Sequence, residues 1–319
     1  MTRVLVKGAG VGGLCAAHEL ATRGAKVTLL EKQESIEHSA SWLAGGMLAP
    51  WCERESAEEP VVSLGKHAAN WWEAALPGHV TRAGTLVVAP PRDTSELGRF
   101  AARTSNYSNV DEDQIAELEP DLVGRFRKGL HFTEEAHLDP RAALKGLWQK
   151  IIDLGGDCRL GESSAPSGDF DVEIDCTGMD YSDPDLRGVR GEMLVLRTGD
   201  VSLSRTVRLL HPRIPIYIVP RSDQHFMVGG TMIETDDDGP ASVRSVMELL
   251  NACYALHPAF AEAQIAEIGT GVRPAWPDNL PRVETNGRTI TINGFYRHGY
   301  LLAPAMACQA ADLVFGQAA

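Results

Sequence analysis

The feature that most constrains this chain is a glycine-rich turn between a short apolar run and a helical pattern. Arg3 to Lys7 is mostly apolar, as expected of a buried strand, and Gly8 to Gly13 follows at once. Apolar residues from Leu14 to Ala21 then recur with helical spacing, and Gly24 is a plausible end for that helix. Because Lys26 to Leu30 has the pattern of a second strand, the segment predicts a strand–turn–helix–strand unit.

Three glycines of this turn, Gly8, Gly10 and Gly13, have the spacing of dinucleotide-binding turns. In such turns the first glycine permits a tight bend, the second lets the backbone approach a pyrophosphate, and the third lets the helix pack on the strand. Glu31 ends the second strand, where a carboxylate accepts hydrogen bonds from ribose hydroxyls and repels a 2′-phosphate. The pattern therefore disfavours NADP but leaves FAD and NAD open. A glycine-rich turn in an unrelated α/β fold is the alternative.

Composition and charge exclude several classes of function. The chain has 319 residues, of which 44% are hydrophobic and 23% charged, as expected of a globular protein with one large or two interleaved domains. Its net charge of −13 disfavours binding to nucleic acid or to an anionic membrane. No apolar run reaches the length of about 18 residues that a membrane-spanning helix needs. Met1 to Arg3 leads straight into a strand without a signal peptide, so we expect a cytoplasmic protein.

The cysteines give no sign of a disulfide framework or a metal centre. All six are scattered and none forms a Cys-x-x-Cys pair, so we expect reduced, mostly buried thiols. No His, Cys and carboxylate residues share a metal-ligand spacing, which disfavours structural zinc.

The remaining sequence mixes helical and strand-rich stretches. Val61 to Leu76 is predicted to be helical. Asp139-Pro140 is a strong helix start, because Asp can cap the free N–H groups and Pro fits the first turn. The half of the chain from Met193 onward is strand-rich, and Pro304 is expected to open a terminal helix.

Several later segments carry a more specific pattern. They are Ala44–Leu48, Asp175–Gly178, Tyr217–Arg221 with Val228–Thr231, and Gly271–Pro274 with Gly294–Pro304. Together they resemble the FAD-dependent amine oxidoreductases of the D-amino acid oxidase and sarcosine oxidase type, and within these the glycine oxidase of thiamine biosynthesis. The resemblance implies an α/β fold in which a Rossmann-like FAD-binding domain is joined to an antiparallel-sheet substrate domain. The implied ranges are 1–78, 140–190 and 270–319 for the FAD-binding domain, and 79–139 and 191–269 for the substrate domain.

The resemblance also implies a catalytic site at Tyr217, Arg273 and Arg297. Arg273 lies two residues after Gly271 and directly before Pro274, so we expect it in a short turn, and such a rigid frame suits bidentate binding of a carboxylate. By resemblance, Arg273 pairs with the substrate carboxylate, Tyr217 gives its hydroxyl to the same group, and Arg297 lies near substrate and flavin. From the residues alone, a structural arginine, a core tyrosine and a surface salt bridge are the alternatives. His298 is interpreted as a hydrogen-bonding residue rather than a general base.

The expected cofactor is non-covalent FAD. Cys308 lies in the terminal helix, on a face of small residues, and is interpreted as a structural thiol rather than a flavin attachment site. The expected FAD-binding residues come from the glycine-rich turn, the end of the second strand and the resembling segments. They are Gly8, Gly10, Val11, Gly12, Gly13, Glu31, Lys32, Gly45, Gly46, Met47, Cys176, Thr177, Gly178, Arg273, Tyr296, Arg297, His298, Gly299, Tyr300 and Leu301.

These expectations combine into one function, the oxidative deamination of a small amino acid, with glycine first and sarcosine or small D-amino acids next. Oxygen would be the acceptor, the products would be the 2-oxo acid, ammonia and hydrogen peroxide, and the pathway would be thiamine thiazole biosynthesis. The alternatives are a D-amino acid dehydrogenase of the same fold with another electron acceptor, and a non-catalytic flavoprotein subunit. Pro215 stands where the family tends to carry a polar residue, so the sequence leaves the exact substrate open. It also leaves open whether the chain forms a homo-oligomer.

Overall fold

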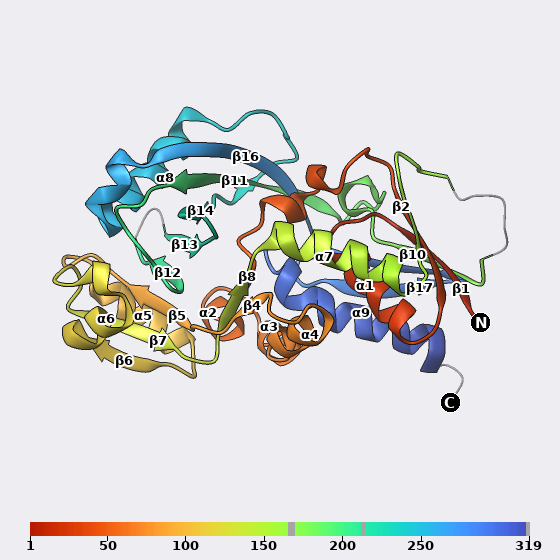
Figure 1. The fold of residues 1–319 in the computed structure, drawn as a ribbon, viewed down its shortest axis with the longest axis horizontal. Coiled ribbons are helices and arrows are strands. Elements are labelled where there is room, and N and C mark those ends of the chain that lie inside the picture. Colours follow the sequence, from red (N-terminus) through yellow and green to blue (C-terminus); the bar gives the residue numbers. More distant parts are fainter. Residues whose placement is uncertain (165–169, 212–214, 317–319) are drawn as a thin grey trace.

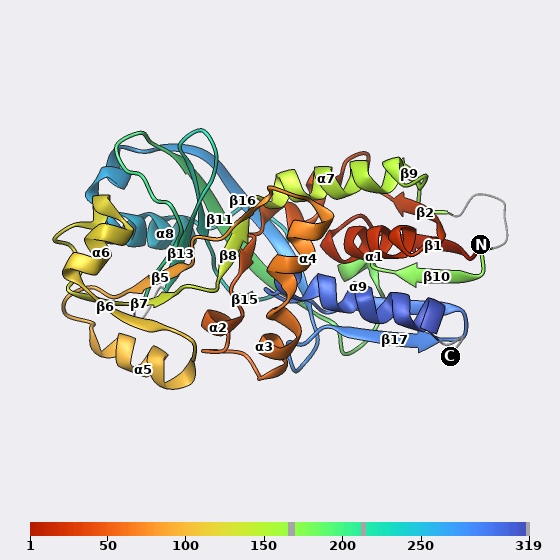
Figure 2. The same ribbon diagram turned by 60° about the horizontal axis from the view of Figure 1, so that its bottom comes forward.

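Two large β-sheets follow one another along the long axis of the molecule (Figure 1). The computed structural model describes residues 1–164, 170–211 and 215–316. One sheet lies at the end that carries both termini, and the other lies at the opposite end. Figure 2 shows the same division after rotation about the long axis.

The first sheet is six-stranded, in the order β17-β18-β10-β1-β2-β9 over the described residues. Its strands are β1 Arg3–Lys7, β2 Lys26–Glu31, β9 Asp157–Leu160, β10 Val172–Asp175, β17 Arg282–Asn286 and β18 Thr289–Asn293. All neighbouring pairs are parallel except the edge pair β17 and β18. The strand–turn–helix–strand unit predicted from the sequence is β1, α1 (Val11–Thr22) and β2, at the centre of this sheet.

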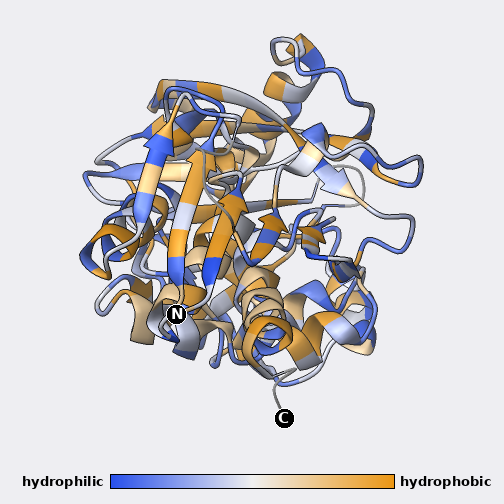
Figure 3. Cartoon of the chain, turned by 90° about the vertical axis from the view of Figure 1, so that its right-hand side faces the viewer, coloured by the Kyte–Doolittle hydropathy of each residue, from blue (hydrophilic) through white to orange (hydrophobic). Residues whose placement is uncertain are grey.

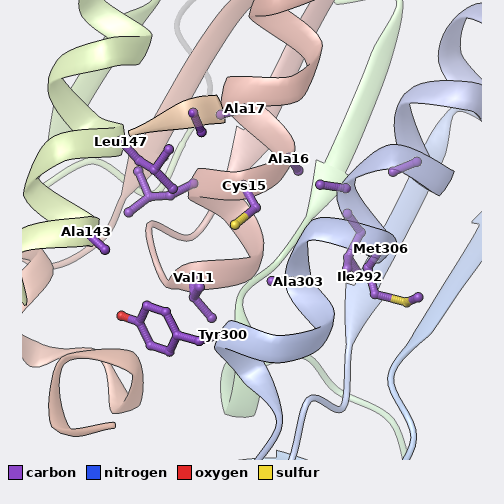
Figure 4. Packing of buried hydrophobic residues seen from close by; sticks show 14 of the residues in the cluster. Val11, Cys15, Ala16, Ala17, Ala143, Leu147, Ile292, Tyr300, Ala303 and Met306 are labelled. Atoms are coloured by element: carbon purple, nitrogen blue, oxygen red, sulfur yellow. The ribbon is translucent and has the colours of Figure 1, made fainter. Parts of the chain in front are cut away.

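Three helices lie side by side against the first sheet: α1, α7 (Pro140–Asp153) and α9 (Gly299–Phe315) (Figures 1 and 2). Figure 4 shows the core between them, where small residues of α1 such as Ala16 and Ala17 face Ala143 of α7 and Ala303 of α9. Small side chains let neighbouring helix backbones approach closely and leave no void. This packing fixes the N-terminus of α1 relative to that of α9.

The expectation that Pro304 opens the terminal helix is wrong. Helix α9 begins at Gly299, and Pro304 lies inside it. A proline has no N–H for the carbonyl four residues earlier, which here belongs to Tyr300. That carbonyl instead accepts a hydrogen bond from the indole of Trp72, at 2.8 Å, so the helix passes through the proline without an unpaired buried carbonyl.

The second sheet is nine-stranded over the described residues. Its order is β15-β11-β14-β13-β12-β5-β7-β6, and β16 pairs with β11 beside this path. Its strands are β5 Thr85–Val88, β6 Ser108–Asp111, β7 Lys128–Phe132, β11 Arg187–Arg197, β12 Thr206–Leu209, β13 Ile216–Pro220, β14 His225–Gly229, β15 Ile233–Glu234 and β16 Gln264–Ala275. All its pairs are antiparallel except β5 with β12, so the sheet is mixed.

Shorter elements join and cover the two sheets. The remaining strands, β3 Met47–Leu48, β4 Val80–Thr81 and β8 Ala136–Leu138, form a three-stranded sheet. The remaining α-helices are α2 Pro50–Glu53, α3 Pro60–Gly65, α4 Ala68–Ala75, α5 Ser95–Arg103, α6 Glu112–Leu118 and α8 Val243–Leu256. Short 3-10 helices span Ile36–His38, Ala40–Leu43, Pro120–Leu122, Gly178–Asp180 and Pro258–Glu262.

Burial follows this layout. One hydrophobic cluster joins the first sheet to α1, α7 and α9, and separate clusters lie on the faces of the second sheet. Figure 3 views the molecule from the end with both termini, where the central strands are mainly hydrophobic and many connecting loops are hydrophilic. Within the described ranges, no helix is both long and apolar enough to cross a membrane.

The predicted fold class, α/β with a Rossmann-like sheet and a second, mostly antiparallel sheet, is confirmed. The domain bounds stay a prediction.

Candidate cofactor and substrate site

The turn between β1 and α1 is shaped by close backbone packing. Gly8 has a left-handed φ of +92°, and a Cβ there would lie 2.5 Å from the carbonyl oxygen of Cys176. A Cβ on Gly13 would lie 1.9 Å from the carbonyl oxygen of Gly8, and one on Gly12 would lie 2.6 Å from the ring of Phe295. Side chains at these positions are therefore excluded by the protein itself.

Gly10 differs from its neighbours in this turn. The nearest atom to a Cβ on Gly10 would be the Ser41 hydroxyl at 3.4 Å, which is an ordinary contact. Gly10 is the N-cap of α1 without any side-chain cap, and the next N–H, of Val11, donates to the same hydroxyl at 3.0 Å. A helix N-terminus whose N-cap residue is a glycine, without a side chain to cap the helix or to block a ligand, is the arrangement that binds a phosphate. These residues therefore fit the pyrophosphate of a dinucleotide.

Glu31 at the end of β2 is tied to the turn. Its carboxylate accepts hydrogen bonds from the backbone N–H of Ala9 at 2.8 Å and of Gln33 at 3.0 Å. A carboxylate has further lone pairs, so Glu31 can still accept from ligand hydroxyls. Lys32 points instead to an exposed ion pair with Asp180.

The segment after β10 lies against the same turn. Cys176 contacts the position of Gly13, and the Thr177 hydroxyl donates to Asp175 at 2.6 Å. Gly178 has a left-handed φ of +63°, and its carbonyl accepts from Asn293 at 2.9 Å. These contacts hold the ends of neighbouring parallel strands together, which is where α/β sheets bind ligands.

The small-residue segment Ala44–Met47 lies between the turn and the second sheet. Gly46 has a φ of +73°, and a Cβ there would lie 2.2 Å from the Leu138 carbonyl. Arg221 donates to the carbonyls of Gly45 at 2.6 Å and Leu138 at 3.0 Å. Burial lowers the pKa of Arg221 to about 10, which leaves it charged at neutral pH. Arg221 therefore fixes this segment through its backbone.

Tyr217 of β13 and Arg273 of β16 converge beside this segment. The prediction of a short turn at Arg273 is wrong, because Arg273 pairs with Val189 inside β16. The Tyr217 ring would lie 2.7 Å from a Cβ on Gly45. A Cβ on Gly230 would lie 3.6 Å from the Tyr217 hydroxyl and 3.7 Å from Nη2 of Arg273. The two polar groups therefore approach the same glycine from different strands.

The charge of Arg273 has no anionic counterpart among the residues that the structure describes. Its hydrogen bond is to the Thr231 carbonyl, at 3.2 Å. Burial lowers the pKa of Arg273 but leaves it a cation at neutral pH, whereas burial raises the pKa of Tyr217, so its hydroxyl keeps its proton. A partly buried cation beside a hydroxyl donor is suited to a ligand carboxylate.

Arg297 has a different environment. Its Nε and Nη2 donate to Oε2 of Glu53 at 2.7 and 2.5 Å, and Nη2 also donates to Ser56 at 3.1 Å. The other Glu53 oxygen accepts from Arg208 at 3.0 Å. Burial alone would raise the pKa of Glu53, but Arg297 and Arg208 lower it to about 2. Arg297 is therefore paired within the protein, although Glu53 is shared with Arg208.

The loop before α9 contributes mainly backbone to the site. Tyr296 has a φ of 51°, and its hydroxyl donates to the Met232 sulfur at 3.1 Å. Tyr300 stacks on Trp72, with its hydroxyl directed to the carbonyls of Ser41 and Pro140, and Leu301 packs against Gly65. The side chains of Tyr300 and Leu301 are thus core residues, and their backbone N–H groups at the start of α9 are what remains for a ligand.

Two further residues of this loop and helix lie close to charges. His298 is buried, and burial lowers its pKa to about 4 despite the neighbouring Glu53, so it is neutral at pH 7. Cys308 lies farther along α9, where it interacts with Glu19 of α1.

No group of His, Cys, Asp and Glu in the described ranges could hold a metal ion.

Sequence reasoning missed the contributions of Ser41, Glu53 and Arg221. Ser41 lies before the Ala44–Leu48 segment and Glu53 lies after it. Arg221 is the last residue of the Tyr217–Arg221 segment. Their partners lie far away in the sequence, so the roles follow from tertiary contacts rather than from spacing. The one sequence signal that could have indicated Glu53 is its position a few residues after the Ala44–Leu48 segment.

Comparisons with known proteins agree with this geometry. Residues 3–313 match the family described as FAD dependent oxidoreductase. A Rhizobium etli protein with the provisional name thiamine biosynthesis oxidoreductase ThiO is 61% identical over 311 residues, which cover 97% of this chain and 95% of that protein. Glycine oxidase from Pseudomonas aeruginosa is 26% identical over 354 residues, with coverages of 99% and 95%. The solved structure of glycine oxidase from Geobacillus kaustophilus has a TM-score of 0.81 at 23% identity, covers 98% of this chain and 95% of its own, and shows the shared fold.

Proposed function

Since the chain belongs to the FAD-dependent oxidoreductase family, we propose that it oxidises a small amino acid, most directly glycine, with oxygen as the electron acceptor. The products are the 2-oxo acid, ammonia and hydrogen peroxide. The observation that carries the proposal is the partly buried Arg273, whose charge is uncompensated by any described carboxylate and which lies next to the Tyr217 hydroxyl. This pair recognises the carboxylate that every amino acid carries.

In this proposal the two side chains set the position of the reacting carbon. Arg273 binds the substrate carboxylate with both terminal nitrogens, and Tyr217 donates its hydroxyl to the same group. Anchoring one end of so small a molecule orients its Cα–H toward the cofactor and supplies much of the catalytic advantage of proximity. The absence of a side chain at Gly45 lets the Tyr217 ring pack directly on the backbone of the Ala44–Met47 segment.

The residues of the first sheet are the proposed FAD-binding residues. The N–H groups at the start of α1 would hold the pyrophosphate and Glu31 the ribose, while the Ala44–Met47 segment and the loop before α9 would lie along the flavin. Bound FAD supplies the hydride acceptor for the reaction. Cys308 contacts α1 rather than this loop, which supports non-covalent binding.

A role in thiamine thiazole biosynthesis is part of the proposal. It is supported by the 61% identity to the Rhizobium etli protein named for that pathway, over nearly the whole of both chains. The preference for glycine is supported by the glycine oxidases that cover almost the whole chain at lower identity. The cytoplasm is the proposed location.

The decisive experiment is a hydrogen peroxide assay of the purified flavoprotein with glycine, sarcosine, D-alanine and D-proline. Peroxide formation with glycine, matched by oxygen consumption, is expected. Turnover that requires an artificial electron acceptor and consumes no oxygen would identify a dehydrogenase. No turnover of any amino acid under either condition would identify a non-catalytic flavoprotein.

A further inference from the structure

Glu53, the last residue of α2, lies at the centre of a buried cluster of basic residues. It is only 5% exposed and accepts hydrogen bonds from both Arg297 and Arg208. Nδ1 of His298 lies 3.4 Å from the carboxylate oxygen that pairs with Arg297. The Glu53 carboxylate thus forms ion pairs with two arginines and lies close to a histidine that is neutral at pH 7.

The cluster adjoins the group that we assign to the substrate carboxylate. Thr231 and Met232 are consecutive residues that contact the two arginines: the Thr231 carbonyl accepts from Arg273 at 3.2 Å, and the Met232 sulfur lies 3.3 Å from Nη1 of Arg297. The guanidinium of Arg297 also acts on Arg273, since their repulsion contributes to the lowered pKa of Arg273. Arg273 and Arg297 are therefore close enough to repel each other, and Glu53 pairs with Arg297 but not with Arg273.

We propose that Glu53 is a positioning and specificity-determining residue: it holds Arg297 and lowers the net positive charge beside it, so that the site selects ligands with one carboxylate over ligands with two. This inference rests on the proposed function, because it takes Arg273 as the carboxylate-binding cation. A ligand with a second carboxylate would place that group near a guanidinium already paired with Glu53. It would then meet the repulsion of Glu53 instead of an available partner.

The test uses two ether acids that lack an amine and therefore cannot be oxidised as amino acids. Methoxyacetate carries one carboxylate, and oxydiacetate carries the same ether with a second carboxylate. Their dissociation constants are measured with the FAD-loaded enzyme by calorimetry and by the change in flavin absorbance. The readout is the ratio of the oxydiacetate constant to the methoxyacetate constant, which a general loss of stability would not change selectively.

Glu53→Gln removes the charge and keeps the shape. We expect the ratio to fall by at least about tenfold, because Arg297 becomes available to a second carboxylate. The double variant Glu53→Gln/Arg297→Gln should return the ratio to within about threefold of wild type, since the effect acts through Arg297. Glu119→Gln is the matched control, because Glu119 is also buried and pairs with an arginine, Arg205, but contacts neither Arg297 nor Arg273, and it should leave the ratio unchanged.

The single variant Arg297→Gln keeps the inference falsifiable if Glu53→Gln does not fold. It leaves the charge of Glu53 less compensated, so the ratio should rise by at least about threefold. A ratio unchanged in every folded variant, with methoxyacetate still bound, would overturn the role of Glu53 and leave the proposed function intact. Failure of wild type to bind methoxyacetate would instead contradict the carboxylate site, and this inference with it.

Discussion

The dinucleotide turn and the carboxylate site obtain their geometry from different sources. The turn is built within one stretch of chain, from Arg3 to Glu31, and the groups proposed to bind its ligand are backbone N–H groups at the start of α1. The proposed carboxylate site joins β13 and β16 of the second sheet and consists of single charged or polar side chains. The turn is therefore vulnerable to added atoms, whereas the carboxylate site is vulnerable to altered charge.

The largest effect is expected from adding one methyl group to the turn. Gly13→Ala would place a Cβ 1.9 Å from the Gly8 carbonyl oxygen, so the turn has to open. We expect loss of bound FAD and a decrease of about 3 kcal/mol in the free energy of unfolding. Flavin absorbance and urea denaturation measure the two effects.

Gly10→Ala is the matched control in the same turn, since no protein atom lies within 3.4 Å of its added Cβ. This variant should keep the stability of wild type and bind FAD more weakly. Equal stability of both alanine variants would contradict the distinction between a packing glycine and a ligand-facing glycine.

The next effect concerns the geometry of a single cation. Arg273→Lys keeps the charge but cannot form a bidentate pair, and losing a buried charge partner costs about 3–5 kcal/mol. We expect kcat/KM for glycine to fall at least about a hundredfold, since each 1.36 kcal/mol is about tenfold, while FAD remains bound.

Steady-state kinetics on glycine, sarcosine and ethylamine distinguish this effect from general damage. Ethylamine has no carboxylate, so its turnover should change far less. Near wild-type efficiency on glycine would move the carboxylate site elsewhere, and Arg297 would be tested next.

A smaller effect is expected at the edge of the cofactor site. Glu31→Ala removes a charged acceptor, and such hydrogen bonds contribute about 1.5–3 kcal/mol, so the dissociation constant for FAD should rise about tenfold or more. The variant should remain folded by circular dichroism. Lys32→Ala, which removes a side chain paired with the exposed Asp180, serves for comparison. Unchanged FAD affinity in Glu31→Ala would remove Glu31 from the ribose site.

The last effect concerns the buried carboxyl group of Glu135. Burial raises the pKa of Glu135 to about 7 from its ordinary 4.5, so between these values the folded protein keeps a proton that the unfolded chain releases. Stability due to this group is therefore fully present below pH 4.5 and lost as the pH approaches 7. Glu135→Gln imitates the protonated form and should stabilise the protein by about 3 kcal/mol at pH 8 relative to its effect at pH 4.5.

Urea denaturation of wild type and Glu135→Gln at both pH values measures this difference. Glu134→Gln, at the exposed neighbouring position, should show no such pH dependence. A Glu135→Gln effect that is the same at both pH values would show that folding does not raise the pKa of Glu135.

The sequence predicted those parts of the molecule whose causes are local. The β1–α1–β2 unit followed from one strand pattern, spaced glycines and one acidic residue, and it is confirmed. The start of α9 was placed wrongly because the Trp72 indole that satisfies the Tyr300 carbonyl is distant in the sequence. The pattern from Val61 to Leu76 predicts helix, and the stretch forms two separate helices, α3 and α4.

Long-range partners explain the rest. Arg273 and Arg297 looked alike as arginines in loop-like sequence, and the difference between them is Glu53, which no spacing rule connects to either. Similarly, Arg221 was part of a resembling segment, but its hold on the Gly45 backbone follows from the packing of two sheets. The assignment of individual site residues to substrate and cofactor stays a prediction until the variants are measured.

The strand order of the first sheet has a consequence for how the protein is made. β18 inserts beside β10, which is itself next to β1, so the sheet around the dinucleotide turn is closed by residues near the end of the chain. The N-terminal half-sheet therefore leaves the ribosome long before the strands and the helix that complete it. Contacts over such long sequence separations form slowly, because loop-closure entropy is lost before the contacts are gained. The complete sheet around the turn can therefore form only after β17 and β18 have been synthesised.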